Sequence, residues 1–384
     1  MSNIPPFDEC ETYTETPHLL EQRLSRRGFL AYTILSIITA GCTPAWQAPA
    51  ATRTPVTTPP LQPTTSSLQR GTLEPIRADN ARRVKSLATL DPGSSWALAV
   101  AWAPSSNILA VGSTLNTVQL WDIHTRKKQT ALQGHHDQVN RIAWSPDGRF
   151  IASASSDGTV RLSDGQRYTS EAVLQGPIEG TAALSIAWSP DSKRLVAGYG
   201  DGAVEVWDVA SLKGHIFLGQ QAPDERTKAV WGIAWSPDSR WIISPQYDGI
   251  LHVWEVESGK LVQTLHSDDL PNDAQWRPDG QLLASSSDKG TVQLWQPGTF
   301  KNIATLTGGG ASGWVYPLAW SPDGQLLVGG YEMGQVQLWD VGTKHVLNTW
   351  QDHTAQVWDV AWSSDGRLIA SASKDGSVRL WGTT

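Results

Sequence analysis

The chain has 384 residues, of which 17% are charged, and a formal net charge of −7 at pH 7. An acidic balance without clusters of Lys and Arg excludes the basic footprint of a nucleic-acid-binding protein. Both cysteines lie within the first 42 residues, so the rest of the chain can form no disulfide and no cysteine-ligated metal site. We therefore expect no nucleic-acid partner, no metal and no other cofactor.

The N-terminal region has the pattern of an export signal. Ser25-Arg-Arg-Gly-Phe-Leu30 begins an apolar run that ends at Gly41. Such a run is too short to span a bilayer but fits the core of a signal peptide. The segment resembles a twin-arginine signal with Arg26 and Arg27 as the pair, although Ala31 stands where that motif often has Lys. We predict that residues 1–41 are an export signal peptide.

A second motif follows at the end of the apolar run. Thr39-Ala-Gly-Cys42 resembles a bacterial lipobox, with Thr39 in place of the usual Leu. The resemblance implies that Cys42 is acylated after cleavage, so that the protein is extracytoplasmic and lipid-anchored to the bacterial cell membrane. The alternative is an uncleaved apolar anchor with a chance cysteine. Either anchor tethers the rest of the chain outside the cytoplasm.

The segment after Cys42 is predicted to be a linker. Residues 43–67 hold six Pro and seven Thr, a composition that cannot build a core and favours extended conformations. We predict that residues 42–80 are a disordered Pro/Thr-rich linker. Fully extended at about 3.1 Å per residue, residues 43–75 would span at most roughly 100 Å.

One structural unit is copied seven times in the rest of the chain. Each copy has a tryptophan followed 19 residues later by a second anchor, which is Trp in all copies but one. A further apolar residue lies 11 residues after each of the first six second anchors, and the step from there to the next copy varies from 11 to 17 residues. Such variable loops lie on one face of a repeat protein, often the binding face. The first anchors are Trp102, Trp144, Trp188, Trp235, Trp276, Trp320 and Trp362, and the second are Trp121, Ser163, Trp207, Trp254, Trp295, Trp339 and Trp381.

Each unit has the pattern of a four-stranded antiparallel meander. In the second copy, short β-rich runs at 140–144, 150–155 and 159–162 are separated by Ser145-Pro-Asp-Gly148 and Asp157-Gly158. Pro sets φ for a turn and Gly supplies positive φ, so these separators are typical of hairpins. The fold is therefore predicted to be all-β.

The period and layout resemble the WD40 family over roughly residues 84–384. Trp121-Asp122, Trp207-Asp208 and Trp339-Asp340 match the dipeptide that names the family, and Gly134-His135 matches its other signature. The resemblance implies a seven-bladed β-propeller, which we assign to residues 81–384.

Closure of the ring can also be predicted. The chain ends three residues after Trp381, so the seventh copy lacks a fourth strand. Lys85-Ser-Leu-Ala-Thr-Leu90 mirrors Lys301-Asn-Ile-Ala-Thr-Leu306, the fourth strand of another copy. We expect this N-terminal strand to complete the last blade and to cover an exposed sheet edge.

The resemblance also implies a hydrogen-bonded network within some blades, built from His, Ser, Asp and Trp. We interpret these residues as structural rather than catalytic. The seventh copy supplies His353, Ser371 or Ser373, Asp375 and Trp381, and the second copy supplies His135 and Asp157 but has Ser163 at the Trp position.

Extra aromatic residues lie outside the repeat pattern, at the entries to the innermost strands and in one turn on the same face. In family terms they resemble the top-surface positions that contact partners, and aromatic side chains are enriched at binding hot spots. The alternative is that they only plug the narrow end of the ring. These candidate partner-binding residues are Trp96, Trp231, Tyr247, Trp314, Tyr316 and Trp358.

No motif for catalysis or phosphate binding stands out, and the recurrent Asp residues are explained by turns. We therefore expect a monomeric propeller that is not an enzyme but a membrane-tethered scaffold binding a protein partner on its loop-rich face. Two alternatives stay open: a receptor for a peptide or small ligand at the aromatic ring mouth, and an enzyme with a site in the central channel.

Overall fold

The computed structural model describes residues 73–105, 107–218, 229–246, 248–267, 269–308 and 313–383, all within the unit Thr65–Thr384. The predicted export pair Arg26 and Arg27, the lipidation site Cys42 and the linker up to residue 72 lie outside the described residues. Tyr247 also lies outside them. No helix in the described ranges is long and apolar enough to cross a membrane.

The described chain forms seven four-stranded antiparallel sheets, each the blade of a propeller. The first three blades are β2 (Ala97–Trp102), β3 (Ile108–Ser113), β4 (Val118–Asp122) and β5 (Lys127–Leu132); β6 (Val139–Trp144), β7 (Phe150–Ser155), β8 (Thr159–Asp164) and β9 (Ser170–Gln175); and β10 (Ala183–Trp188), β11 (Arg194–Tyr199), β12 (Val204–Asp208) and β13 (Lys213–Leu218).

The next three blades are β14 (Ala234–Trp235), β15 (Trp241–Gln246), β16 (Ile250–Glu255) and β17 (Lys260–His266); β18 (Pro271–Trp276), β19 (Leu283–Ser287), β20 (Thr291–Gln296) and β21 (Lys301–Thr307); and β22 (Val315–Trp320), β23 (Leu326–Tyr331), β24 (Val336–Asp340) and β25 (His345–Trp350). Blade 7 consists of β26 (Val357–Trp362), β27 (Leu368–Ser373), β28 (Val378–Thr383) and β1 (Val84–Leu90).

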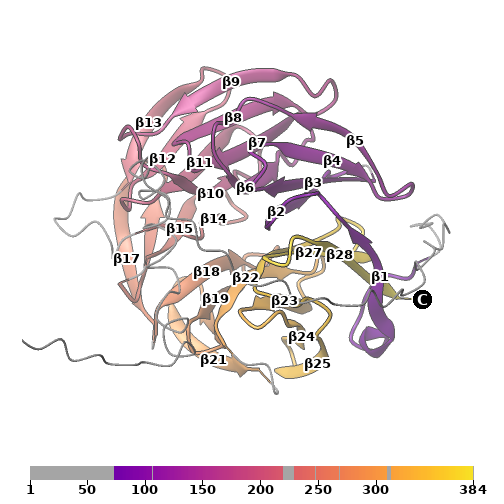
Figure 1. The fold of residues 1–384 in the computed structure, drawn as a ribbon. Helices are drawn as coiled ribbons and strands as arrows, with labels where there is room; N and C mark the ends of the chain where they lie inside the picture. Colours follow the sequence, from indigo (N-terminus) through magenta and orange to yellow (C-terminus); the bar gives the residue numbers. More distant parts are fainter. Residues whose placement is uncertain are drawn as a thin grey trace, which may run out of the picture. The chain divides into compact units, whose positions relative to one another are not determined.

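The blades close into a ring around a central axis (Figure 1). The first strand of each blade is innermost and contacts the first strands of the two neighbouring blades, and β26 contacts β2 to complete the circle. This arrangement confirms the predicted seven-bladed, all-β propeller.

The predicted closure by an N-terminal strand is also confirmed. β1 pairs antiparallel with β28, with Val84 opposite Thr383 and Leu90 opposite Val378. Val84 and Leu90 are buried, at 3% and 2% exposed. The first strand of the propeller thus covers the edge that the last strand would otherwise expose.

The folded part begins before the predicted boundary at residue 81. The backbone N–H of Ile76 donates to the Gly366 carbonyl at 2.8 Å, and the Ile76 side chain is 3% exposed. Thr383 Oγ1 donates to the Glu74 carbonyl at 3.0 Å. The short 3₁₀ helix η2 (Ala81–Arg83) then leads into β1. Residues 73–80 therefore pack against blade 7, because the Ile76 side chain is buried there. They are not part of a disordered linker, which was predicted to continue to residue 80.

The first-anchor tryptophans join neighbouring blades. Trp320 Nε1 donates to the Gln275 carbonyl of the preceding blade at 2.9 Å, and Trp362 Nε1 donates to the Ala319 carbonyl at 3.2 Å. Trp102, Trp188 and Trp235 make the equivalent bond. In these five blades the tryptophan therefore buries an indole ring and also links two sheets, whereas the Nε1 atoms of Trp144 and Trp276 have no partner among the described residues.

Blade 7 contains the complete His-Ser-Asp-Trp network. Trp381 Nε1 donates to Ser371 Oγ at 2.9 Å, Ser371 Oγ lies 2.7 Å from His353 Nε2, and His353 Nδ1 lies 2.9 Å from Asp375 Oδ2. The serine of the network is thus Ser371, because Ser373 Oγ donates to the Ala355 carbonyl instead. Burial alone would raise the pKa of Asp375, but the bonds from His353 and a neighbouring serine lower it below its usual value.

Blade 2 contains the same network without tryptophan. His135 Nδ1 lies 2.9 Å from Asp157 Oδ2, and His135 Nε2 lies 2.8 Å from Ser153 Oγ. Ser163 occupies the position of Trp381, opposite Ile151 in the sheet. Both histidines are buried in hydrogen-bonded structural positions.

Candidate partner-binding site at the top face

The meander divides the connections between two ends of the propeller. We define the top face as the end that carries the turns between the second and third strands and the connections from each outer strand to the next blade. The bottom face carries the turns between the first and second strands and between the third and fourth. The connections of variable length, and the five described aromatic residues predicted to bind a partner, belong to the top face.

The innermost strands share a β-bulge at their top ends. The register shifts between Val357 and Asp359 in β26 and between Val315 and Leu318 in β22. The equivalent shift occurs in β2, β6, β10 and β18. A bulge takes a residue out of the ladder and changes the direction of its side chain, and bulges are common beside functional sites. Trp358 and Tyr316 occupy these bulges.

The equivalent residues in two other blades show where the bulge side chain is directed. Asn140 Nδ2 donates to the Ala183 carbonyl of the next blade at 2.8 Å, and Asn272 Nδ2 donates to the Val315 carbonyl at 2.8 Å. The bulge side chain therefore lies against the neighbouring blade. An aromatic residue at this position is partly covered by that blade.

Three of the predicted aromatic residues form one cluster. The ring centroids of Trp314 and Tyr316 are 5.9 Å apart, and those of Tyr316 and Trp358 are 5.6 Å apart. Trp314 and Trp358 are partly exposed, whereas Tyr316 is only 4% exposed. The bulge in β22 places Tyr316 between the two tryptophans, so it supports them and offers little surface to a partner. We call Trp314, Tyr316 and Trp358 the aromatic cluster.

The other two described aromatic candidates lie elsewhere on the top face. Trp96 is in the connection from β1 to β2, and Lys374 Nζ lies 5.2 Å from its ring centroid. Trp231 lies before the two-residue strand β14 of blade 4. Both are partly exposed.

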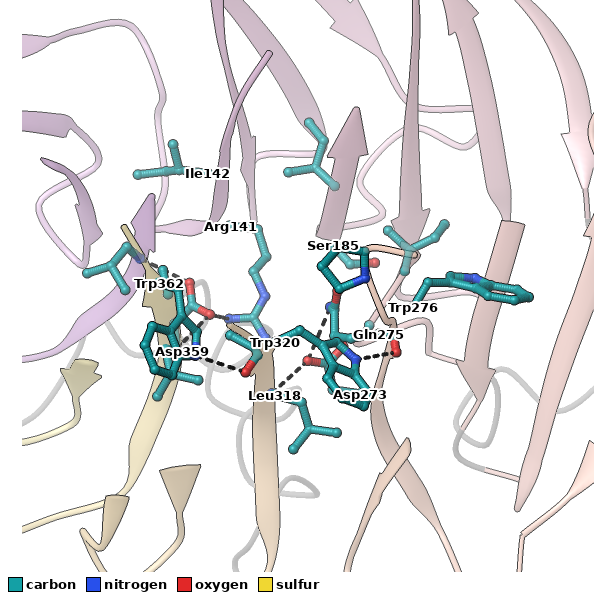
Figure 2. Close-up of a pocket in the computed structure, with 18 residues that line it drawn as sticks. Arg141, Ile142, Ser185, Asp273, Gln275, Trp276, Leu318, Trp320, Asp359 and Trp362 are labelled. Atoms are coloured by element: carbon teal, nitrogen blue, oxygen red, sulfur yellow. Dashed lines mark hydrogen bonds and ion pairs between the residues drawn. The ribbon is translucent and has the colours of Figure 1, made fainter. Parts of the chain in front are cut away.

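Arg141, Asp273 and Asp359 lie close together between the innermost strands (Figure 2). Arg141 Nη1 on β6 donates to the Trp358 carbonyl at 2.9 Å and lies 3.3 Å from Asp359 Oδ1. Arg141 belongs to blade 2 and Trp358 to blade 7, so this side chain bridges two blades that are not neighbours. It supports the backbone that carries Trp358.

Two aspartates on the innermost strands, at the same repeat position as Arg141, accept hydrogen bonds from the backbone of the next blade. Asp359 Oδ2 accepts the Val100 N–H at 3.0 Å, and Asp273 Oδ2 accepts the Leu318 N–H at 3.0 Å. Burial raises the pKa of Asp273 to about 6, against the opposing effect of Arg141, and burial likewise raises the pKa of Asp359. The channel therefore contains carboxylates that are costly to ionise and gain from a nearby positive charge.

These side chains line a cavity of about 380 Å³ formed by the innermost strands. Its walls include Ile142, Ser185, Gln275, Trp276 and Leu318. Within the described ranges, no group of three His, Cys, Asp or Glu side chains is placed to hold a metal ion. The arrangement can recognise a polar or cationic group.

Sequence reasoning did not identify Arg141, Asp273 and Asp359. Each lies three residues before a first-anchor Trp, where other copies have small or apolar residues. Charge at an otherwise uncharged repeat position was the signal that could have found them. The residues at this position in the other copies are Ala99, Ser185, Gly232 and Pro317.

The closed ring of seven blades and the His-Ser-Asp-Trp network define a β-propeller of the WD40 class. Residues 74–316 match the family model described as IFT122 first beta-propeller, and residues 300–340 and 344–382 match the model described as WD domain, G-beta repeat. Because the first match covers more than half of the chain, the protein belongs to the IFT122 first beta-propeller family. The comparison with curated proteins gives no match.

Proposed function

We propose that this protein is an extracytoplasmic, membrane-tethered scaffold that binds a protein partner on its top face. The observation that carries the proposal is the aromatic cluster, in which buried Tyr316 supports the partly exposed Trp314 and Trp358. Large aromatic side chains on a rigid support are the usual anchors of binding hot spots, because they bury much area at little cost in rotamer entropy.

The family supports the scaffold part of this proposal. WD40 propellers commonly bind protein partners and are generally not enzymes. We therefore propose no catalytic role for the carboxylates of the channel. The propeller acts as a monomer, with the cluster on one side of the channel end.

The proposed location depends on the N-terminal motifs. Arg26→Lys with Arg27→Lys should block export, and Cys42→Ala should release the protein from the membrane. Membrane fractionation and uptake of a labelled fatty acid measure both effects. If the Cys42→Ala protein still fractionates with membranes and the native protein takes up no fatty acid, the lipoprotein proposal is wrong.

The partner is to be identified by affinity capture of the full-length protein from its own membrane, followed by mass spectrometry. Trp358→Ala should weaken binding of the captured partner by about 2 kcal/mol or more, the typical effect of truncating a hot spot. The matched control is Trp241→Ala, because Trp241 is also partly exposed but begins β15 at the bottom face. Equal affinity of both variants for the captured partner would contradict the proposal.

The cavity supports a second candidate, a receptor for a small ligand. Its volume of about 380 Å³ lies within the range of small-molecule sites, and its mainly polar lining includes Arg141, Asp273 and Asp359. In that case Asp273→Asn should abolish ligand binding while Trp358→Ala leaves it unchanged.

A further inference from the structure

The two faces of the propeller differ sharply in charge. In the described connections of the top face, the only Lys and Arg residues are Lys289 and Lys374. The acidic residues of the same connections are Asp91, Asp137, Asp157, Glu179, Asp201, Asp248, Asp269, Asp288, Glu332, Asp352 and Asp375.

The bottom face has a balanced composition. Its described connections carry the basic residues Arg126, Arg149, Arg167, Lys193, Arg240, Arg277, Lys344 and Arg367 and the acidic residues Asp147, Asp191, Asp238, Glu257, Asp279, Asp323 and Asp365.

Ion pairs at the bottom face reflect this balance. Arg194 Nη2 lies 2.9 Å from Glu257 Oε1, and Arg277 Nη2 lies 2.7 Å from Asp279 Oδ2. Opposite charges at this end therefore neutralise each other locally. The described connections of the top face have only two cations against eleven acidic residues, so these connections keep a net negative charge.

The acidic residues of the top face reach the aromatic cluster. The Glu332 N–H donates to the Trp314 carbonyl at 3.0 Å. Burial and the nearby charge of Asp288 raise the pKa of Glu332, against the opposing effects of a backbone bond from Trp314 and the charge of Lys374. Asp359 lies next to Trp358 in the chain and lines the cavity. The partly exposed indole rings thus lie beside the carboxylates of Glu332 and Asp359, of which Asp359 is paired with Arg141.

This combination favours a cation. A Lys or Arg side chain can lie on the face of an indole ring while its charge pairs with neighbouring carboxylates, and Arg in particular stacks on aromatic rings. The protein shows such a contact within its own top face, where Lys374 lies over Trp96. An acidic ligand would face repulsion from the same groups.

We propose that the top face binds a basic partner, a protein segment that places Lys or Arg side chains against Trp314 and Trp358. This inference rests on the proposed scaffold function and specifies the chemistry of its partner. The negative field attracts the segment over a distance of about one Debye length, and the aromatic cluster then provides the short-range contact.

The test uses a fluorescent oligoarginine peptide as probe and an oligoglutamate peptide of equal length as its control. Binding to the folded protein is measured by fluorescence anisotropy at increasing salt. Asp248→Asn, Glu332→Gln and Asp352→Asn are combined in a top-face variant. Asp191→Asn, Glu257→Gln and Asp323→Asn are combined in a bottom-face variant with the same change in net charge and the same residue types.

We expect oligoarginine to bind, with an affinity that falls as salt rises. The top-face variant should bind it about tenfold more weakly, and the bottom-face variant should change by less than about twofold. Trp358→Ala should cost about fivefold, the size of a cation–π contact. An unchanged melting temperature shows that the variants are folded.

Equal losses in the two charge variants, or no binding of oligoarginine, would overturn the inference. A captured partner that depends on Trp358 but not on the three top-face carboxylates would also overturn it, while leaving the scaffold function in place. A captured partner that depends on neither would overturn both.

Discussion

Blade 7 and blade 4 come from the same repeat but are stabilised differently. Blade 7 has a six-residue inner strand, the complete network from Trp381 to Asp375, and an outer strand supplied by the other end of the propeller. Blade 4 has a two-residue inner strand, and among its described residues only the Trp254 to Ser244 bond corresponds to the network. A blade can therefore form from its strands and Trp anchors alone. The polar network stabilises some blades further but is not needed in every blade.

The largest loss of stability is expected from removing the outer strand of blade 7, which is supplied by the N-terminal part of the propeller. Deleting residues 80–91 removes β1 and exposes the edge of β28 along with the core around Val84 and Leu90. We expect a loss on the order of 5 kcal/mol or more in the free energy of unfolding, or failure to fold. Leu90→Ala, which keeps the strand, should cost about 3 kcal/mol in chemical denaturation. Wild-type stability of both variants would contradict the closure.

The network of blade 7 gives the next largest effect. His353→Ala leaves Ser371 and Asp375 without their partner, and His353 is only 1% exposed, so we expect a loss of about 3 kcal/mol. Ser244→Ala in blade 4 removes a single bond to Trp254 and should cost about 1 kcal/mol. Urea unfolding of the two variants measures the difference. Equal losses would mean that the network adds nothing beyond one hydrogen bond.

Blade 3 has a buried carboxylate, Glu205, at a position where several other blades have an uncharged side chain. Glu205 is 7% exposed, and burial raises its pKa to about 7. Three other blades have Gln at this position, and in blade 6 the Tyr331 hydroxyl donates to Gln337 at 2.9 Å. In blade 3, Glu205 Oε2 and the Tyr199 hydroxyl have no partner among the described residues.

Glu205→Gln should therefore stabilise the protein in a pH-dependent way. When the pKa of an acid is higher in the folded state than in the unfolded state, ionisation of that acid destabilises the folded state. The free energy of unfolding therefore falls as pH rises from the unfolded-state pKa through the folded-state pKa. We expect a gain of about 2 kcal/mol at pH 8 and almost none at pH 4. The free energy of unfolding measured at both pH values checks this, and a gain that does not depend on pH would contradict the buried, raised carboxylate.

The smallest expected effect on stability is at the aromatic cluster. Trp358→Ala removes a partly exposed side chain from a β-bulge, so it should cost less than about 1 kcal/mol of folding free energy. Tyr316→Ala, at a buried position, should cost about 3 kcal/mol. Thermal unfolding of the two variants measures the contrast. A large loss in Trp358→Ala would show that this side chain mainly plugs the ring.

Sequence periodicity predicted the blades and the closing strand because it depends on local turn chemistry and on the fixed spacing of the Trp anchors. It also assigned Trp314 and Trp358 to the correct end of the propeller. It could not predict the burial of Tyr316, because a β-bulge breaks the alternation of side chains and turns that residue toward the next blade. The bond from Arg141 to Trp358 joins residues 217 positions apart, and no local pattern indicates such a contact.

Hydrogen exchange of the propeller with and without its captured partner tests the central claim most directly. The top-face binding site predicts slower exchange of backbone amides in residues 313–316, 332–335 and 351–358, which surround the aromatic cluster. Bottom-face turns such as 277–282 and 363–367 should exchange at the same rate in both states. Protection confined to the bottom turns or to the outer strands would contradict a partner site at the top face.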